Sequence, residues 1–188
     1  MIAPTRAVQI LWLAWLLGWM LAARSTAGTV ARQSVKSRLA HSVFVWAGAL
    51  LLFIQPQGSG FLFHPLLPAE PPVAWGGVAL VALGLGFSAW ARMHLGRLWS
   101  ATVTLKENHA VVRTGPYGIT RHPIYTGLLL ALAGTALVRC TPAALIGLVL
   151  LVVGFGIKIR QEERLLLQHF GDAYQAYRAE VPALIPRP

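Results

Sequence analysis

The last third of the chain holds an apolar stretch that is interrupted near its middle and bounded by two polar motifs. The motifs are Arg121-His122-Pro123-Ile124-Tyr125 and Glu162-Glu163, and the interruption is Arg139-Cys140-Thr141-Pro142. This pattern predicts two antiparallel membrane helices, which would bring both motifs to the same membrane face. Ionisable residues at a membrane are costly to desolvate and commonly mark a functional site. We therefore expect a polar site where the two motifs meet.

The composition of the whole chain favours a membrane protein. Of its 188 residues, 56% are hydrophobic and 12% are charged, and the mean hydropathy of +0.60 is too high for an ordinary soluble domain. Cys140 is the single cysteine, so no intramolecular disulfide can form. No metal site is expected, because the scattered histidines lack metal-ligand spacing: His41, His64, His94 and His169.

Five apolar segments predict an all-α integral membrane protein with about five transmembrane helices and a cytoplasmic, amphipathic C-terminal helix. Several segments have about 15 residues, or about 22 Å of helix, against a hydrocarbon core of about 30 Å. The helices should therefore extend beyond their apolar residues, or flanking side chains should reach the interface. The first segment could be a secretory signal, but its tryptophans share one helical face, and we expect a retained helix. The segments are residues 7–23, 40–54, 73–91, 123–138 and 142–157.

These segments divide a single membrane domain, residues 1–188, into four parts. Residues 1–91 would form three transmembrane helices, and residues 92–122 a cytoplasmic loop. Residues 123–157 would form the transmembrane hairpin, and residues 158–188 a cytoplasmic helix and tail. Apolar residues at spacings of three and four predict this last helix. Gly171 should weaken it, and Pro182 should end it.

The basic residues predict how the chain crosses the membrane. All lysines and arginines except Arg6 and Arg139 lie in residues 24–38, 92–121 and 158–187. By the positive-inside rule, these segments are cytoplasmic and the N-terminus lies outside, in the cell (inner) membrane for a bacterial chain. The net charge of +10 is then the expected bias of cytoplasmic loops near anionic lipids. No fold or aromatic–basic platform indicates a nucleic-acid ligand.

The entry to the fourth apolar segment, with Arg121 and His122, suits an anionic group of a ligand. Pro123 fits the first turn of a helix, and helix N-termini attract anions, an attraction that His122 strengthens. Lys158 and Glu162 lie four residues apart and share a helix face. Each residue alone has a simpler interpretation, such as an intrahelical salt bridge, a helix cap or an aromatic residue at the membrane interface.

The motifs together are more specific than each alone. The run from His109 to Gly127, then Glu162-Glu163-Arg164-Leu165-Leu166, then the run from Phe170 to Tyr177, resembles the isoprenylcysteine carboxyl methyltransferase family and its phospholipid methyltransferase relatives. The resemblance covers roughly residues 109–182, and the first three apolar segments resemble nothing specific. It implies a membrane enzyme that transfers a methyl group from S-adenosylmethionine to a lipophilic acceptor.

The resemblance also implies roles for individual residues. Lys158 matches the basic residue that faces the acceptor, with Arg160 as a second candidate. Eukaryotic members carry arginine where this chain has Lys158. A lysine ammonium cannot donate the pair of hydrogen bonds that an arginine guanidinium donates to a carboxylate, so the identity of the acceptor stays open. The expected cofactor-binding residues are His109, Ala110, Val111, Val112, Tyr117, His122, Pro123, Ile124, Tyr125, Glu162 and Glu163.

The chemistry of S-adenosylmethionine agrees with these roles. His122 and the helix terminus can bind its carboxylate, and Glu162 can bind its ammonium. Aromatic and apolar side chains can surround its adenine and its sulfonium. Methyl transfer is a direct displacement that needs alignment and desolvation rather than a metal. A carboxylate acceptor needs no general base, and we expect carboxyl O-methylation of an isoprenylcysteine-like or isoprenoid substrate. The acceptor would enter from the bilayer and the cofactor from the cytoplasm.

Two alternatives come from other functional classes. NADPH-dependent reductases of the sterol type resemble this family in the C-terminal hairpin. They usually carry an acidic residue directly after the tyrosine-x-glycine of the motif, where this chain has Leu128 after Gly127. A noncatalytic membrane scaffold or small transporter would use the polar clusters as lipid headgroup anchors. The sequence leaves the oligomeric state and the choice between O- and N-methylation open.

Overall fold

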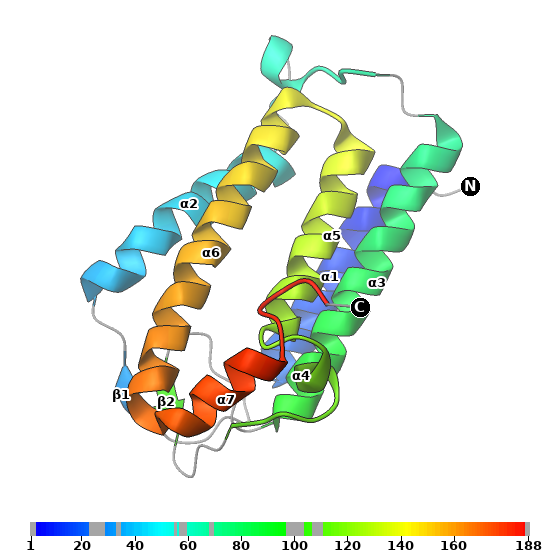
Figure 1. Cartoon of the computed structure of the whole chain (residues 1–188). Coiled ribbons are helices and arrows are strands. Elements are labelled where there is room, and N and C mark those ends of the chain that lie inside the picture. Colours follow the sequence, from blue (N-terminus) through cyan, green and yellow to red (C-terminus); the bar gives the residue numbers. More distant parts are fainter. Residues whose placement is uncertain are drawn as a thin grey trace.

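The computed structural model describes residues 3–22, 29–32, 35–54, 56, 60–67, 70–96, 104–106 and 111–186. Over these residues it is a bundle of long helices with one short antiparallel strand pair (Figure 1). The elements in chain order are α1 (Pro4–Ala22), β1 (Thr29–Arg32), α2 (Val35–Phe53), the 3-10 helix η1 (Phe61–Phe63), α3 (Pro71–Leu95), β2 (Thr104–Lys106), α4 (Pro116–Ile119), α5 (Pro123–Arg139), α6 (Pro142–Phe170) and α7 (Asp172–Glu180). The predicted all-α membrane class is confirmed, with the small β1–β2 pair as an addition that the sequence did not predict.

Each of the five predicted apolar segments corresponds to one helix, namely α1, α2, α3, α5 or α6, and the first two segments extend one residue past the end of their helix. Helices α1, α3 and α6 are long and apolar enough to cross a membrane, and α5 and the apolar part of α2 are shorter. The expected extension beyond the apolar residues occurs in α3, with 25 residues, and in α6, with 29. The predicted C-terminal helix is continuous with α6 as far as Phe170. It breaks at Gly171, where φ is +51°.

The turn between α5 and α6 forms where the apolar stretch is interrupted. Cys140 takes a left-handed conformation with φ 45° and ψ 43°, which ends α5. Thr141 then caps α6 by accepting a hydrogen bond from the backbone nitrogen of Ala144 at 3.1 Å, and Pro142 occupies the first turn. The chain therefore reverses direction within three residues, as the broken apolar pattern predicts.

Glycines decide which helices pack closely. Helix α5 contacts α3 far more extensively than it contacts its hairpin partner α6, and α6 packs mainly on α2. A Cβ atom added at Gly84 of α3 would lie 2.4 Å from the carbonyl oxygen of Gly127 in α5, and one at Gly134 would lie 2.6 Å from that of Gly77. Small residues at these crossings let the backbones approach, which is how membrane helices associate without a hydrophobic driving force.

Helix α1 is joined to the same helices by polar contacts. The indole nitrogen of Trp12 donates to the hydroxyl of Thr135 in α5 at 3.0 Å. The guanidinium of Arg92 in α3 donates to the carbonyl oxygen of Ala22 at 2.7 Å. Helices α4 and α7 and the strands gather at one end of the bundle, beside the start of α5, while η1 and the α5–α6 turn lie at the other (Figure 1). Both polar motifs lie at the end that carries α4 and α7.

Candidate functional site

The hairpin brings the two polar motifs into direct contact. The Nε2 atom of His122 lies 3.2 Å from the Oε1 atom of Glu163. The hydroxyl of Tyr125 donates to the Oε2 atom of Glu162 at 2.9 Å. The expectation that the motifs meet at one end of the hairpin is therefore confirmed.

Glu163 belongs to a cluster of basic side chains. Its Oε1 atom accepts hydrogen bonds from the Nε atom of Arg121 at 2.9 Å and from the Nη2 atom at 2.7 Å. Arg178 in α7 places its Nε atom 3.5 Å from the other carboxylate oxygen. The side chain of Arg121 is 9% exposed and that of Glu163 13%, so these charges depend on one another for solvation. We call Arg121, His122, Glu163 and Arg178 the arginine cluster.

The C-terminal segment 181–184 lies along the start of α5. Arg121 and His122 donate their backbone N–H groups to carbonyl oxygens of this segment at 2.8 and 3.0 Å, and the hydroxyl of Thr126 donates to another at 2.8 Å. Arg121 also donates from its side chain to the carbonyl oxygen of Val181. The backbone N–H groups of Arg121 and His122 are thus bound within the chain and are not available to an external anion.

Glu162 faces a different set of neighbours from Glu163, because consecutive helical residues point about 100° apart. The ring of Tyr125 stacks with that of His122, at a centroid distance of 5.7 Å, and with that of Phe155, at 5.4 Å. The Nζ atom of Lys158 lies 5.4 Å from the centroid of the Tyr125 ring, a cation–π distance. Glu162 and Lys158 thus border one aromatic stack, which we call the tyrosine stack.

Phe155 is a member of this stack that sequence reasoning missed. It lies within the apolar segment 142–157, and nothing in its local sequence separates it from neighbouring apolar residues. A usable signal was its spacing, because Phe155, Lys158 and Glu162 lie three and four residues apart and so share one helix face.

Tyr117 lies beside the same site on the short helix α4. The hydroxyl of Tyr177 in α7 donates to the backbone carbonyl of Tyr117 at 2.6 Å, which ties α4 to α7. Burial raises the pKa of Tyr117, and the negative charge of Glu162 raises it further. Its hydroxyl therefore stays protonated and can donate a hydrogen bond. Gly115, with φ +58°, makes the turn before α4, where a Cβ atom would lie 2.8 Å from the ring of His94.

Tyr174 is a second residue that sequence reasoning did not assign to the site. The whole residue is 2% exposed, and its hydroxyl has no hydrogen-bond partner among the residues that the structure describes. Burial raises its pKa, with Glu163 adding to the effect; burial also raises the pKa of Tyr177 to about 12. A buried hydroxyl without a partner costs free energy, so Tyr174 offers an unused donor next to the arginine cluster.

The remaining predicted residues occupy varied environments. Pro123 is buried, and Ile124, Val111 and Val112 are half-buried. Arg160 is exposed on α6. His109 and Ala110 lie outside the described residues.

Comparisons with known proteins agree with the motif geometry. A model described as the isoprenylcysteine carboxyl methyltransferase (ICMT) family matches residues 77–168. Protein-S-isoprenylcysteine O-methyltransferase B of Arabidopsis thaliana is 30% identical over 144 residues, which cover 75% of this chain and 73% of the plant protein. The chain belongs to the isoprenylcysteine carboxyl methyltransferase family. The resemblance that the motifs predicted is therefore confirmed.

Two further relatives of this ICMT family member match shorter stretches. Protein-S-isoprenylcysteine O-methyltransferase of Schizosaccharomyces pombe is 34% identical over 113 residues, covering 58% of this chain and 48% of the yeast protein. The cobalt-zinc-cadmium resistance protein CzcN of Cupriavidus metallidurans is 32% identical over 117 residues, covering 60% of this chain and 54% of that protein.

The match to the ICMT family begins earlier in the chain than the motifs suggested. The expectation that the first three apolar segments resemble nothing specific is wrong for the third, because the family match starts at Gly77 in α3. The packing supplies a physical reason, since Gly77 and Gly84 are the positions at which α3 approaches α5. The site-bearing helix α5 thus depends on α3 for its position.

Proposed function

We propose that this ICMT family member is a methyltransferase that uses S-adenosylmethionine to methylate the carboxyl group of a lipophilic acceptor, such as an isoprenylcysteine or a small isoprenoid acid. The observation that carries the proposal is the Tyr125–Glu162 pair beside Lys158, at the polar end of an apolar hairpin. Relatives named as protein-S-isoprenylcysteine O-methyltransferases support the choice of reaction.

The residues around the tyrosine stack fit the groups of the cofactor. Glu162 offers a carboxylate for the ammonium, and the rings of Tyr125 and Tyr117 offer polarisable faces for the adenine and the sulfonium. When bound, S-adenosylmethionine supplies an electrophilic methyl group.

The two adjacent glutamates would then have separate tasks. Glu162 would bind the cofactor, whereas Glu163 would hold the start of α5 and the C-terminal segment in place through the arginine cluster. His122 would contribute to both tasks, because its ring contacts the carboxylate of Glu163 and stacks on Tyr125. Arg121 and Glu163 act here as positioning residues.

Lys158 would hold the acceptor. A carboxylic acid is already ionised at neutral pH, so the acceptor oxygen is nucleophilic without a general base. A single ammonium can pair with that carboxylate as a point charge. Exclusion of water by the half-buried aromatic rings would strengthen this ion pair and favour transfer. Arg160, which is exposed on α6, is the second candidate for this contact.

The basic residues support a cytoplasmic site. Among the described basic residues, Arg113, Arg121, Lys158, Arg160, Arg164 and Arg178 lie at the end of the bundle with α4 and α7, while Arg139 lies at the other end. By the positive-inside rule, the C-terminus and the site then face the cytoplasm and the N-terminus lies outside. The cofactor would enter from the cytoplasm, and the acceptor from the bilayer.

Isothermal titration with the purified chain tests the cofactor assignment. We expect S-adenosylhomocysteine, the demethylated product, to bind in a one-to-one ratio and NADPH to give no heat of binding. Binding of NADPH in place of S-adenosylhomocysteine would instead support a reductase. Glu162→Gln should weaken the binding, whereas the matched control Glu180→Gln, which changes an exposed glutamate of α7, should leave it unchanged.

A further inference from the structure

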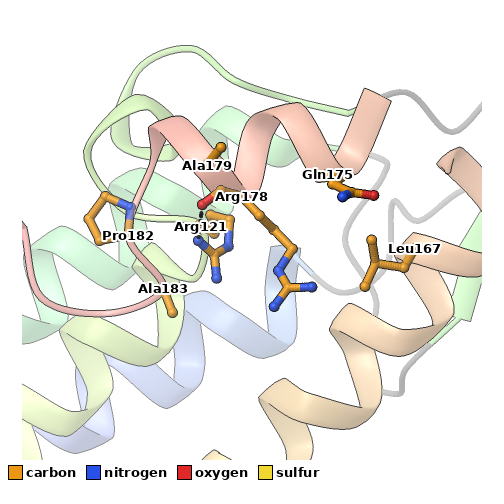
Figure 2. A pocket seen from close by; sticks show the side chains of 7 residues that line it. All are labelled: Arg121, Leu167, Gln175, Arg178, Ala179, Pro182 and Ala183. Atoms are coloured by element: carbon orange, nitrogen blue, oxygen red, sulfur yellow. Dashed lines mark hydrogen bonds between the residues drawn. The ribbon is translucent and has the colours of Figure 1, made fainter. Parts of the chain in front are cut away.

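A pocket lies between α6, α7 and the C-terminal segment. Its volume is about 600 Å³, and neither Tyr125, Lys158 nor Glu162 lines it. Figure 2 shows Arg121 and Arg178 in this pocket, with the guanidinium of Arg178 directed into the open space. The pocket is therefore separate from the tyrosine stack to which the proposed cofactor is assigned.

The polar lining carries a surplus of positive charge. Arg121 and Arg178 share the single carboxylate of Glu163, so one positive charge is left over. Arg178 approaches Glu163 through its Nε atom, and neither of its terminal nitrogens has a hydrogen-bond partner within the described part of the chain. The pocket is also lined by Gln175, whose amide can donate. A guanidinium whose terminal N–H groups are unpaired can donate two hydrogen bonds to the oxygens of one phosphate.

The rest of the lining is apolar. Leu167, Ala179, Pro182 and Ala183 complete the pocket. A free inorganic anion gains nothing from such walls, whereas an amphiphile buries apolar surface against them. The pocket therefore matches a molecule that joins a phosphate to apolar chains.

The position of the pocket along the bundle points to the same kind of molecule. Arg121 lies two residues before α5 begins at Pro123, and α6 continues past its apolar part to Leu167. The interfacial layer on each side of the hydrocarbon core is about 5 to 8 Å thick. Arg121 therefore lies at the depth of the lipid headgroups, whereas Leu167, ten residues or about 15 Å past the apolar part of α6, lies further from the hydrocarbon core.

We propose that this pocket binds the phosphate of an anionic membrane phospholipid, at a site distinct from that of the methyl acceptor. Arg178 and Gln175 contact the phosphate, while Pro182 and Ala183, which lie against the start of α5, contact the start of the acyl chains. Because Arg121 and Arg178 also hold Glu163, the lipid reinforces the contact between α7 and the start of α5. This proposal does not depend on the assignment of the cofactor to the tyrosine stack.

Binding of short-chain lipids to the purified protein in detergent tests the proposal. The probes are a short-chain phosphatidylglycerol, the phosphatidylcholine with the same acyl chains, and inorganic phosphate, each measured by native mass spectrometry. We expect phosphatidylglycerol to bind about tenfold more tightly than phosphatidylcholine, because the choline cation is repelled by the surplus positive charge. Inorganic phosphate should compete poorly, because it leaves the apolar walls uncovered.

Two alanines of α7 provide a matched pair of variants. Ala179 lines the pocket and Ala176 does not, and both are exposed. Ala179→Glu places a carboxylate next to the bound phosphate and should lower the affinity for phosphatidylglycerol about tenfold. Ala176→Glu makes the same change in charge and should leave the affinity within about twofold. Both variants should keep the wild-type melting temperature, since neither side chain is buried.

Three results would overturn the proposal. Equal losses in Ala179→Glu and Ala176→Glu would mean that lipid binding depends on the charge of the whole surface. Equal binding of the two lipids would remove the role of the surplus charge. Competition by inorganic phosphate as strong as that by phosphatidylglycerol would assign the pocket to a free phosphate instead of a lipid.

Discussion

Substituting Glu162 and Glu163 separately tests whether Glu162 binds the cofactor while Glu163 stabilises the fold. Glu163→Gln removes the charge that solvates Arg121 and Arg178, and breaking a buried ion pair costs about 3 to 5 kcal/mol. We expect about 3 kcal/mol, the lower end of that range, because the Arg178 side chain is 42% exposed. For a chain of this length, such a loss lowers the melting temperature by about 6 to 12 °C.

Glu162→Gln should have the opposite profile. Glutamine can still accept the hydrogen bond from Tyr125, so we expect little change in the free energy of unfolding. It loses the negative charge that is proposed to bind the cofactor's ammonium. A charged hydrogen bond is worth about 1.5 to 3 kcal/mol, so the affinity for S-adenosylhomocysteine should fall by about 10- to 150-fold.

Thermal unfolding and isothermal titration on the same two preparations distinguish these outcomes. Glu180→Gln is the control for both measurements, because its carboxylate is exposed and lies 3.9 Å from Arg113. The reasoning would be refuted if both substitutions lowered the melting temperature equally. It would also be refuted if Glu163→Gln lost cofactor affinity at an unchanged melting temperature.

Three further predictions concern packing, the acceptor and the link between α4 and α7. Gly84→Ala should lower the free energy of unfolding by about 1 to 3 kcal/mol, because the added Cβ atom would overlap the facing helix. Gly86→Ala should not lower it, because no atom lies within 4 Å of the added Cβ atom. Denaturation of the two variants in detergent compares these free energies. Lys158→Ala should slow methyl transfer and leave the affinity for S-adenosylhomocysteine unchanged. Arg160→Ala should change neither the rate nor this affinity, and steady-state kinetics of the two variants test the difference. Tyr177→Phe removes the hydrogen bond to α4 and should cost about 1 kcal/mol, measurable as a lower melting temperature.

The sequence predicted the hairpin because its signals are local. The apolar pattern, the interruption at Cys140 and the capping residues around Pro142 specify two helices and a reversal within one short stretch. The meeting of His122 with Glu163 follows from that reversal alone. A periodic pattern and a turn therefore suffice to place two polar motifs at one end of a helix pair.

Features that depend on distant segments could not be predicted in the same way. The separate roles of Glu162 and Glu163 depend on Arg178 and on segment 181–184, which folds back onto the start of α5 without any periodic pattern. Hydropathy also identifies which segments are helices, but not which helices pack together. The seven-residue spacing shared by Gly77 and Gly84 with the facing glycines of α5 was the available signal for the α3–α5 contact.

The most direct test of the proposed reaction is transfer of a radiolabelled methyl group from S-adenosylmethionine to a prenylated cysteine. The proposal predicts that the free acid is labelled and that its methyl ester is not. Mild alkali should release the label as volatile methanol, because only a carboxyl methyl ester hydrolyses under these conditions. Label that resists alkali, or label on the ester and the acid alike, would contradict carboxyl methylation by this chain.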